Sequence, residues 1–576
     1  MTKAHILRLG LAQINTTVGD FVGNLKKMTT ALEQARSLGI NILAFPEMAV
    51  CGYPPEDLLL KPQFIEKNLE YLNKLMEATE GLTVVVGFVD SCEGNLYNAA
   101  AIIDRGRLTG TYRKRFLPNY GVFDEKRYFR EGDTCPVFIL GGIPVGVAIC
   151  EDLWYDHGPS TAVARTGAQL IVNISASPYH YCKAGEWEEL IVRRARQDEV
   201  AIGCINLVGG QDELVFDGNS LIVGCDGGIL GRGMPFDEDL VVADIDLELG
   251  AKKTNGTADP AEREWPVSRV IISEEMARVE KPILSERVVP KLEQEAEIYA
   301  ALVLGTRDYF AKNGFKKAAL GISGGIDSGL VATVAVDALG EGNVVGVAMP
   351  SRYSSPGSIA DAEKLCRNLG VRLIALPIEP MFEAYLESLA DAFRGLPTDS
   401  AEENIQARIR GNLLMALSNK FGWLVLPTGN KSEMAAGYAT LYGDMAGGFA
   451  ILKDVPKTMV YKLAAYRNAQ AGYDLIPQSV IDKPPSAELR FNQKDTDSLP
   501  PYEQLDPIIK AYVEDDKSIE QMLSVGMEEA VVRKVVRLID NSEYKRRQAP
   551  PGIKITARAF GKDRRLPITN KFGGGG

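Results

Sequence analysis

The chain has 576 residues, 45% of them hydrophobic and 24% charged, so it is an ordinary globular protein too long for a single core. Its formal net charge of −12 argues against a general surface for nucleic acid or for an anionic membrane. Its eight cysteines form no C-x-x-C pair, which argues against a zinc ribbon or a disulfide framework and favours the reducing cytoplasm. No apolar run reaches the roughly 18 residues of a spanning helix, which favours a soluble protein over a membrane protein.

The first half of the chain predicts many strands and few helices. From residue 5 to about residue 249, short apolar runs such as ILRLGLAQI and PVGVAIC alternate with helical patterns such as NLKKMTTALEQARSLG. This pattern is typical of sheets packed together with helices outside. In residues 251–292 this alternation of apolar runs and helical patterns stops, and four prolines stand among charged residues. We interpret them as a linker between a domain of residues 1–250 and a domain of residues 293–576.

The second half alternates strands and helices. A helical pattern over residues 292–314 leads into the strand KAALGIS, and the further strands NVVGVAMP, RLIALPI and WLVLPTG are separated by helical segments. Such alternation predicts an α/β domain with a doubly wound parallel sheet, which binds ligands at the carboxyl ends of its strands. After Ser486 the chain is rich in proline and charge and ends in GGGG, so we expect it to be partly mobile.

One cysteine stands where a buried strand can present a thiol at its tip. Cys150 ends the apolar run GIPVGVAIC, and a cysteine nucleophile needs a base or a positive charge nearby. The chain has only three histidines, but Glu47 in AFPEM ends one predicted strand and Lys114 in TYRKRFLPN follows another. If these strand ends meet, Glu47 would take the thiol proton and Lys114 would stabilise the thiolate and an oxyanion. The alternative is a buried, inert cysteine with two solvated charges.

A glycine-rich loop lies between a strand and a helix in the second half. The sequence GISGGIDS spans Gly321 to Ser328 and offers backbone N–H groups and a helix N-terminus to phosphate oxygens. It lacks the GK[ST] ending of a P-loop. Asp327 is badly placed to meet an anion directly, so a Mg²⁺ bridge is the natural solution. A plain glycine turn is the alternative.

Both motifs resemble known families. The segments FPEM, YRKRFLPN and AICEDLW are similar to the nitrilase superfamily of amidases, which implies an αββα sandwich and a Glu-Lys-Cys triad. GISGGIDS resembles the pyrophosphatase-type loop of adenylating enzymes, which split ATP to AMP and pyrophosphate as they activate a carboxylate. An amidase beside an adenylating domain implies an amidotransferase, since ammonia can attack an acyl adenylate.

Three further segments indicate which substrate accepts the ammonia. GNKSEMAAGYATLYGD, KPPSAEL and YKRRQAPPG are similar to the glutamine-dependent NAD synthetases. The resemblance implies a ligase that converts deamido-NAD, ATP, glutamine and water to NAD, AMP, pyrophosphate and glutamate, with ATP as substrate and Mg²⁺ as cofactor. Two alternatives stay open: an amidotransferase that adenylates a different carboxylate or a nucleobase carbonyl, and a nucleotide-sensing scaffold with an inactive amidase half.

The same resemblance assigns binding residues. Besides the catalytic Glu47, Lys114 and Cys150, it implies glutamine contacts at Tyr120, Ser177 and Lys183. It implies ATP contacts at Gly321, Ile322, Ser323, Gly324, Gly325, Ile326, Asp327, Ser328, Thr428, Lys457 and Ser486. The metal ligands would be Asp327 and Glu433, and the deamido-NAD site would include Asn404, Glu433 and Lys545. Leu441 and Gly448 depart from the lysine and aspartate of shorter, ammonia-only relatives, which implies redistributed contacts to the pyridine nucleotide.

Transfer of ammonia between two sites sets a further expectation. Released ammonia stays a nucleophile only while it is kept from protonation and bulk water, so we expect an enclosed route with mostly apolar walls. A neighbouring subunit could complete such an enclosure, which favours a homo-oligomer. Small molecules are the expected partners, with no nucleic acid and no membrane.

Overall fold

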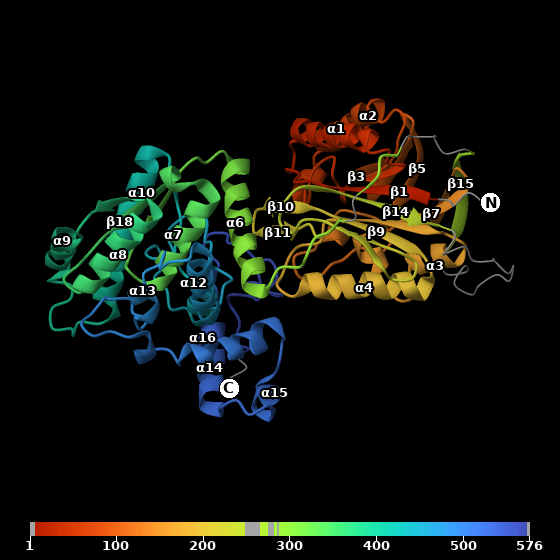
Figure 1. The fold of residues 1–576 in the computed structure, drawn as a ribbon. Coiled ribbons are helices and arrows are strands. Elements are labelled where there is room, and N and C mark those ends of the chain that lie inside the picture. The colour runs from red at the N-terminus through yellow and green to blue at the C-terminus, as the bar shows by residue number, and fades with distance from the viewer. Residues whose placement is uncertain (1–5, 248–264, 275–280, 285–286, 573–576) are drawn as a thin grey trace. The chain divides into compact units, whose positions relative to one another are not determined.

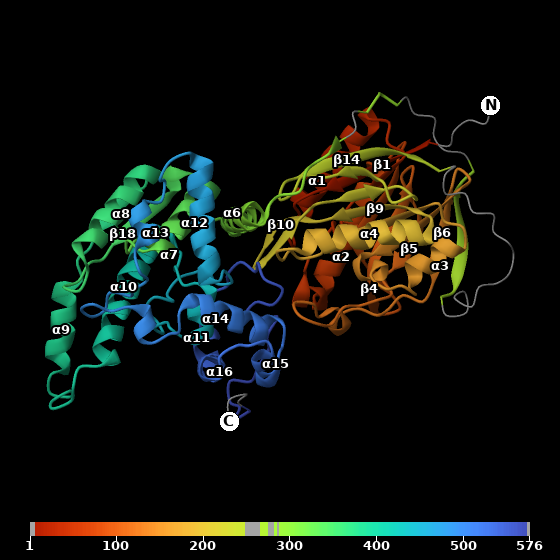
Figure 2. The ribbon, with the colours of Figure 1, turned by 60° about the horizontal axis from the view of Figure 1, so that its bottom comes forward.

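The computed structural model describes residues 6–247, 265–274, 281–284 and 287–572. It divides into two units, residues 1–211 with 215–292 and residues 293–576 with 212–214. Figure 1 labels their helices and strands, and Figure 2 shows them from a second direction. Within these described ranges, no helix has both the length and the apolar character needed to span a membrane.

Two sheets form the centre of the first unit. In spatial order the six-stranded sheet consists of β14 (Asp239–Asp246), β1 (Ile6–Gln13), β2 (Ile42–Ala44), β3 (Thr83–Cys92), β4 (Asn95–Asp104) and β5 (Arg107–Arg113). The eight-stranded sheet consists of β15 (Val267–Ser273), β6 (Cys135–Leu140), β7 (Ile143–Ile149), β8 (Leu170–Ser175), β9 (Ala201–Asn206), β12 (Leu221–Val223), β13 (Ile229–Arg232) and β16 (Arg287–Val288). A short pair, β10 (Val208–Gln211) and β11 (Leu214–Asp217), stands apart from both.

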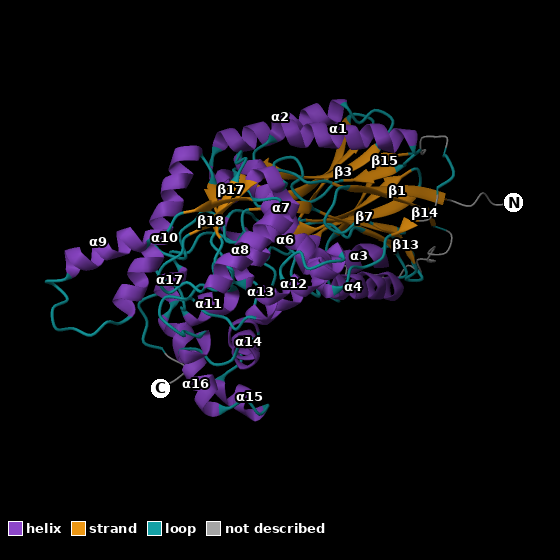
Figure 3. Ribbon diagram, turned by 60° about the vertical axis from the view of Figure 1, so that its left-hand side comes forward, coloured by secondary structure: helices purple, strands orange, loops and turns teal. Residues whose placement is uncertain are grey.

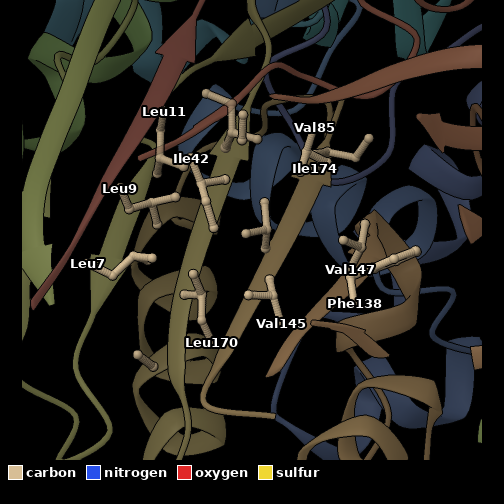
Figure 4. Close-up of a cluster of buried hydrophobic side chains, with 14 of the residues drawn as sticks. Leu7, Leu9, Leu11, Ile42, Val85, Phe138, Val145, Val147, Leu170 and Ile174 are labelled. Atoms are coloured by element: carbon tan, nitrogen blue, oxygen red, sulfur yellow. The ribbon is translucent and has the colours of Figure 1, made fainter. Parts of the chain in front are cut away.

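The main core lies between these sheets. Leu7, Leu9 and Leu11 alternate along β1 and face the other sheet, as the two-residue period of a strand requires. Opposite them lie Val145 and Val147 of β7, with Leu170 and Ile174 of β8 (Figure 4). Helices α1 (Phe21–Ser37) and α2 (Pro62–Glu77) pack on the outer face of the first sheet, and α3 (Pro159–Arg165) and α4 (Lys183–Asp198) on that of the second (Figure 1). The predicted αββα sandwich is therefore confirmed.

The segment interpreted as a linker also contributes to this unit. β15 pairs in parallel with β6, and β16 pairs with β13, so residues 267–273 and 287–288 extend the eight-stranded sheet at its two edges. These strands could not be predicted from the sequence, because the stretch is rich in proline and charge and has no alternating apolar pattern. They pair through backbone hydrogen bonds, which leave no mark in the side-chain pattern. The rest of residues 251–292 lies partly outside the described residues.

A parallel four-stranded sheet organises the second unit. Its spatial order is β19 (Arg372–Ala375), β18 (Val344–Ala348), β17 (Ala318–Gly321) and β20 (Leu424–Val425). On one face lie α6 (Gln294–Asn313), α7 (Ile326–Leu339), α8 (Pro356–Leu369) and α12 (Lys457–Ala471), and on the other α9 (Glu379–Leu389) and α10 (Ser400–Phe421), as the purple helices beside the orange strands show in Figure 3. The strand order reverses between β17 and β20, which confirms the doubly wound sheet and places the expected ligand crevice there.

Beyond Ser486 the expectation of a partly mobile tail is wrong for residues 487–572. This part contains the helices α14 (Tyr502–Ile509), α15 (Ile519–Ser524), α16 (Glu529–Asn541) and α17 (Glu543–Arg546). They pack with the short helix α11 (Lys431–Ala436) around a core of their own, to which α16 contributes Val532, Val535 and Ile539. A second short helix, α13 (Gln478–Asp482), precedes them.

Candidate active sites

The cysteine predicted as a nucleophile lies at the tip of β7. Cys150 begins the short 3₁₀ helix Cys150–Leu153, is 3% exposed, and has a φ of +44°, a left-handed conformation that is strained for a side chain of this kind. Asp152 fixes the turn, because its carboxylate accepts hydrogen bonds from the Ile149 N–H (3.3 Å), the Phe116 N–H (2.8 Å) and the Tyr112 hydroxyl (2.7 Å). This carboxylate therefore ties the cysteine turn to the segment that follows β5.

The predicted base and lysine meet at the neighbouring strand ends. Lys114 follows β5 and its Nζ donates to Glu47 Oε1 at 2.7 Å, with both side chains 1% exposed. Glu47 lies just after β2, and its other oxygen accepts from the Ala176 N–H (2.9 Å) after β8. Burial chiefly raises the pKa of Cys150, Glu47 raises it further, and Lys114 lowers it. Both charges are therefore within electrostatic reach of the thiol.

A fourth buried residue, Glu125, escaped the sequence reasoning. Its Oε1 accepts from Lys114 Nζ (2.9 Å) and from the Tyr53 hydroxyl (3.2 Å). Asn98 Nδ2 bridges the two carboxylates, donating to Glu47 Oε1 at 2.6 Å and to Glu125 Oε2 at 3.3 Å. Burial raises the pKa of Glu125 to about 7, although Lys114 lowers it. Burial by itself would lower the Lys114 pKa, but Glu125 and Glu47 raise it well above its usual value.

The residues predicted to bind glutamine lie around this centre. The Tyr120 hydroxyl donates to Glu151 Oε2 at 3.0 Å, and Glu151 directly follows Cys150. The Ser177 N–H donates to Asn206 Oδ1 at 2.9 Å in the loop after β8. Lys183 begins α4, its Nζ donates to the Pro178 carbonyl, and its charge lowers the pKa of Cys150. Tyr120, Lys183 and the unpredicted, buried Glu151 are therefore within electrostatic reach of Cys150. Ser177 directly follows Ala176, whose N–H binds Glu47.

The glycine-rich loop joins β17 to α7 at the point where the sheet order reverses. Gly324 has a φ of +77°, and a Cβ there would lie 2.2 Å from the Ser358 carbonyl oxygen, so only glycine fits. Ser328 Oγ donates to the Gly325 carbonyl (3.0 Å) and accepts from the Ser323 N–H (3.3 Å). These bonds close the loop into a cradle at the start of α7.

A pocket of about 300 Å³ opens above this loop. All but one of the predicted ATP-contacting residues line it, namely Gly321, Ile322, Ser323, Gly325, Ile326, Asp327, Ser328, Thr428, Lys457 and Ser486. Gly324 is the exception, because it faces Ser358 of α8. The wall also includes Glu488, whose Oε1 accepts from Ser358 Oγ at 2.6 Å and so fastens the segment of residues 483–489 to α8.

Two carboxylates of this pocket form the candidate magnesium site. Lys457, 2% exposed, forms an ion pair with Asp327, and its Nζ lies 4.0 Å from Glu433 Oε1. Burial and the charge of Asp327 raise the pKa of Glu433 to about 8, and Lys457 lowers it. Two hard oxygen donors beside a phosphate cradle fit Mg²⁺, which is commonly held by one or two carboxylates and substrate phosphates. Among the described residues, no three His, Cys, Asp or Glu side chains gather as a metal site.

Two predicted deamido-NAD residues lie behind the pocket wall. Asn404 Oδ1 accepts from Thr440 Oγ1 at 2.6 Å, and Lys545 Nζ donates to the carbonyls of Gly437 (2.7 Å) and Ala439 (2.8 Å). Neither lines the pocket, whereas Tyr438, Ala439, Gly443 and Asp444 of the segment they hold do. Glu433, the third predicted residue, lines the pocket directly.

Leu441 and Gly448, the two positions that differ from the shorter relatives, both lie in the second unit. Leu441 belongs to the same segment, and its carbonyl accepts from Arg408 Nε at 3.3 Å. A Cβ at Gly448 would lie 2.4 Å from Leu424 Cδ1, so an aspartate could enter this position only if the side chain of Leu424 moved.

Comparison with known proteins covers both units. A family model described as carbon-nitrogen hydrolase matches residues 8–253, and one described as NAD synthase matches residues 298–549. The glutamine-dependent NAD(+) synthetase of Thermotoga maritima is 49% identical, with 98% of this chain and 99% of the relative covered. That of Aquifex aeolicus is 47% identical over 98% of this chain and all of the relative. The solved glutamine-dependent NAD+ synthetase of Acinetobacter baumannii, in complex with ADP, is 39% identical with a TM-score of 0.75, covering 98% of this chain and 99% of that one.

Proposed function

Because the chain belongs to the family of glutamine-dependent NAD(+) synthetases, we propose that its two candidate active sites each catalyse one part of a single ligase reaction. The enzyme converts deamido-NAD, ATP, glutamine and water to NAD, AMP, pyrophosphate and glutamate. In our proposal Glu47, Lys114 and Cys150 release ammonia from glutamine, and the pocket above the Gly321–Ser328 loop adenylates the nicotinate carboxylate. The observation that carries this assignment is the buried Lys114–Glu47 pair within electrostatic reach of the buried Cys150 thiol at a strand tip.

The amidase step follows from that geometry. Glu47 accepts the thiol proton as Cys150 Sγ attacks the side-chain amide carbon of glutamine. The Lys114 ammonium stabilises the negative oxygen that forms, in a site from which water is largely excluded. Glu47 then gives its proton to the leaving nitrogen, which departs as ammonia, and water hydrolyses the thioester to glutamate. Glu125 keeps the Lys114 ammonium in place and balances its charge.

Glutamine is held at its α-carbon end in this proposal. Tyr120, Ser177 and Lys183 contact it, with the Lys183 ammonium suited to the α-carboxylate. We add Glu151 for the α-amino group, because its buried carboxylate lies next to Cys150 and is oriented by the Tyr120 and Tyr155 hydroxyls, at 3.0 and 3.1 Å.

The second pocket binds the two nucleotides. The Gly321–Ser328 loop receives the ATP phosphates at the N-terminus of α7, with Thr428, Lys457 and Ser486 as further contacts. The N–H groups of Ile322, Ser323 and Gly325 already donate within the protein and hold the loop in shape. Asp327 and Glu433 would hold Mg²⁺, which supplies positive charge at the phosphates when it is bound. Glu433 also faces deamido-NAD, and Asn404 and Lys545 support the wall against which it rests.

The remaining proposals concern organisation. We assign the amidase domain to residues 1–250 and the synthetase domain to residues 293–576, with residues 251–292 as a connection whose strands β15 and β16 join the first sheet system. The need to keep ammonia unprotonated supports an enclosed route and a homo-oligomer. A reducing cytoplasm is supported by the cysteines, since no disulfide joins any of the eight within the described structure.

An assay with glutamine and with ammonium tests whether one site releases ammonia and the other forms NAD. The enzyme should form NAD, AMP, pyrophosphate and glutamate in equal amounts from glutamine, and NAD without glutamate from ammonium. Adenylation that is fastest with a carboxylate other than deamido-NAD would overturn the assignment of the acceptor.

A further inference from the structure

One buried asparagine joins the two proposed metal ligands from behind the wall of the second pocket. Asn430 lies between β20 and α11, is 0% exposed, and stands outside the lining of the pocket. Its Nδ2 donates to Asp327 Oδ1 at 2.9 Å, and its Oδ1 accepts from the Glu433 N–H at 3.0 Å. The backbone N–H of Asn430 in turn donates to Glu433 Oε2 at 3.2 Å. A single residue therefore contacts both carboxylates, one at the start of α7 and one in α11.

Helix capping explains only half of this arrangement. Asn430 is the N-cap of α11, and its exchange of hydrogen bonds with Glu433 forms a capping box. Serine and aspartate cap a helix about as well as asparagine does, because the cap needs only an oxygen that accepts an N–H. Asparagine adds an NH₂ group, which both of them lack. Here that group donates to Asp327, which α11 itself does not require.

The other oxygen of Asp327 is held by a residue of a different kind. Lys457 pairs with Asp327 Oδ2, and its Nζ lies 4.0 Å from Glu433 Oε1. Lys457 lines the pocket, so the phosphates of a nucleotide can compete for its ammonium. The side chain of Asn430 is fully buried and outside the lining, so a ligand in the pocket cannot compete for its amide. When a nucleotide binds Lys457, Asn430 still links the two carboxylates.

We propose that Asn430 is the positioning residue that fixes Asp327 and Glu433 at the spacing that binds Mg²⁺ together with ATP. This inference rests on the function proposed above and extends it to a residue behind the pocket wall. Two carboxylates repel each other, and their shared hydrogen bonds to Asn430 oppose that repulsion. Replacing a residue that orients metal ligands lowers the affinity for the metal about 10- to 100-fold.

Binding of ATP to the full chain, with and without Mg²⁺, tests this role without turnover. In the absence of deamido-NAD, calorimetry gives the Kd of ATP in EDTA and in excess Mg²⁺, and the ratio of the two measures the contribution of the metal. Asn430→Ser and Asn430→Thr keep an oxygen for the Glu433 N–H, but their side chains are too short to reach Asp327 as well. We expect both variants to lower the ratio about tenfold relative to wild type. Their Kd in EDTA should stay within about threefold, because the glycine-rich loop still receives the phosphates.

Asn468→Ser is the matched control. The Asn468 amide makes two hydrogen bonds to the backbone of Ile476, both at 2.8 Å, near the opposite end of α12 from Lys457. This variant loses the same chemical group in the same unit and should keep the wild-type ratio.

Three results would overturn the inference. They are a wild-type ratio in the Asn430 variants, an equal loss of ATP affinity with and without Mg²⁺, and the same fall of the ratio in Asn468→Ser. The second would show a damaged pocket rather than displaced metal ligands. A wild-type chain that binds no ATP under either condition would instead overturn the proposed function itself.

Discussion

Replacing Glu125 by glutamine should slow glutamine hydrolysis and spare synthesis from ammonium. The amide keeps the volume of the side chain and one oxygen for the Tyr53 hydroxyl, but it removes the charge that lies 2.9 Å from Lys114 Nζ. A hydrogen bond to a charged group contributes about 1.5–3 kcal/mol, which corresponds to a roughly 10- to 100-fold fall in kcat/KM for glutamine. The synthetase pocket contains none of these residues, so ammonium-dependent NAD formation should not change.

The pH dependence gives a second readout. Because the pKa of Glu125 is raised to about 7, wild-type glutaminase activity should fall as pH drops through about 7 and this carboxylate is protonated. The folded state binds this proton more tightly than the unfolded chain, whose glutamate pKa is about 4.3, so the group's contribution to stability is full below about 4.3 and is lost as pH rises through about 7. Protonation of Glu125 therefore does not itself destabilise the folded state, and Glu125→Gln should show a flat profile there.

The assay measures glutamate release between pH 6 and 8 for wild type, Glu125→Gln and the control Glu131→Gln. Glu131 has a side chain 59% exposed, in a surface pair with Lys126, and its replacement should have no effect. A Glu125→Gln enzyme with wild-type kcat/KM and the same fall in glutamate release below about pH 7 would refute the role of this carboxylate. A parallel loss of ammonium-dependent synthesis would point to general misfolding instead.

Four further outcomes can be checked. Cys150→Ala should abolish synthesis from glutamine and leave synthesis from ammonium, whereas equal loss with both sources would contradict the two-site scheme. Asp327→Asn should stop pyrophosphate release with either nitrogen source, and normal release would remove the loop from the ATP site. Asp152→Ala should lower the free energy of unfolding by roughly 3 kcal/mol in denaturant melts, because it leaves the Phe116 N–H and the Tyr112 hydroxyl unpaired. With amide-labelled glutamine and excess unlabelled ammonium, most NAD should carry the label, and dilution to the bulk composition would exclude an enclosed route.

The sequence predicted the parts of the sites that lie at strand ends. Cys150 follows a continuous apolar run, and such a run is typical of a strand buried on both faces, so its tip could be located without coordinates. Gly321 to Ser328 could be placed for the same reason, between a strand and a helix. Glu125 gave no such signal, because it begins a short 3₁₀ helix among charged residues and only the fold brings it to Lys114.

Other features were missed for reasons that differ. Val532, Val535, Val536 and Ile539 repeat with the three- and four-residue spacing of an amphipathic helix, so α16 could have been predicted despite the prolines around it. Asn404 and Lys545 hold the segment of residues 437–444 but do not line the pocket, and motif comparison cannot distinguish a residue that lines a pocket from one that holds its wall.

The two sites use a similar arrangement of charge in opposite ways. In each, a buried lysine is associated with two carboxylates, Lys114 with Glu47 and Glu125, and Lys457 with Asp327 and, more distantly, Glu433. The first set is sealed, with side chains 1% to 6% exposed, which suits an uncharged amide that must meet fixed charges without water. In the second set each carboxylate is 18% exposed to the pocket. A ligand that brings its own charges can compete there for the lysine and the carboxylates. If the proposed assignment of the two sites holds, we expect nucleotide binding to rearrange the ion pairs of the second set and glutamine binding to leave those of the first set intact.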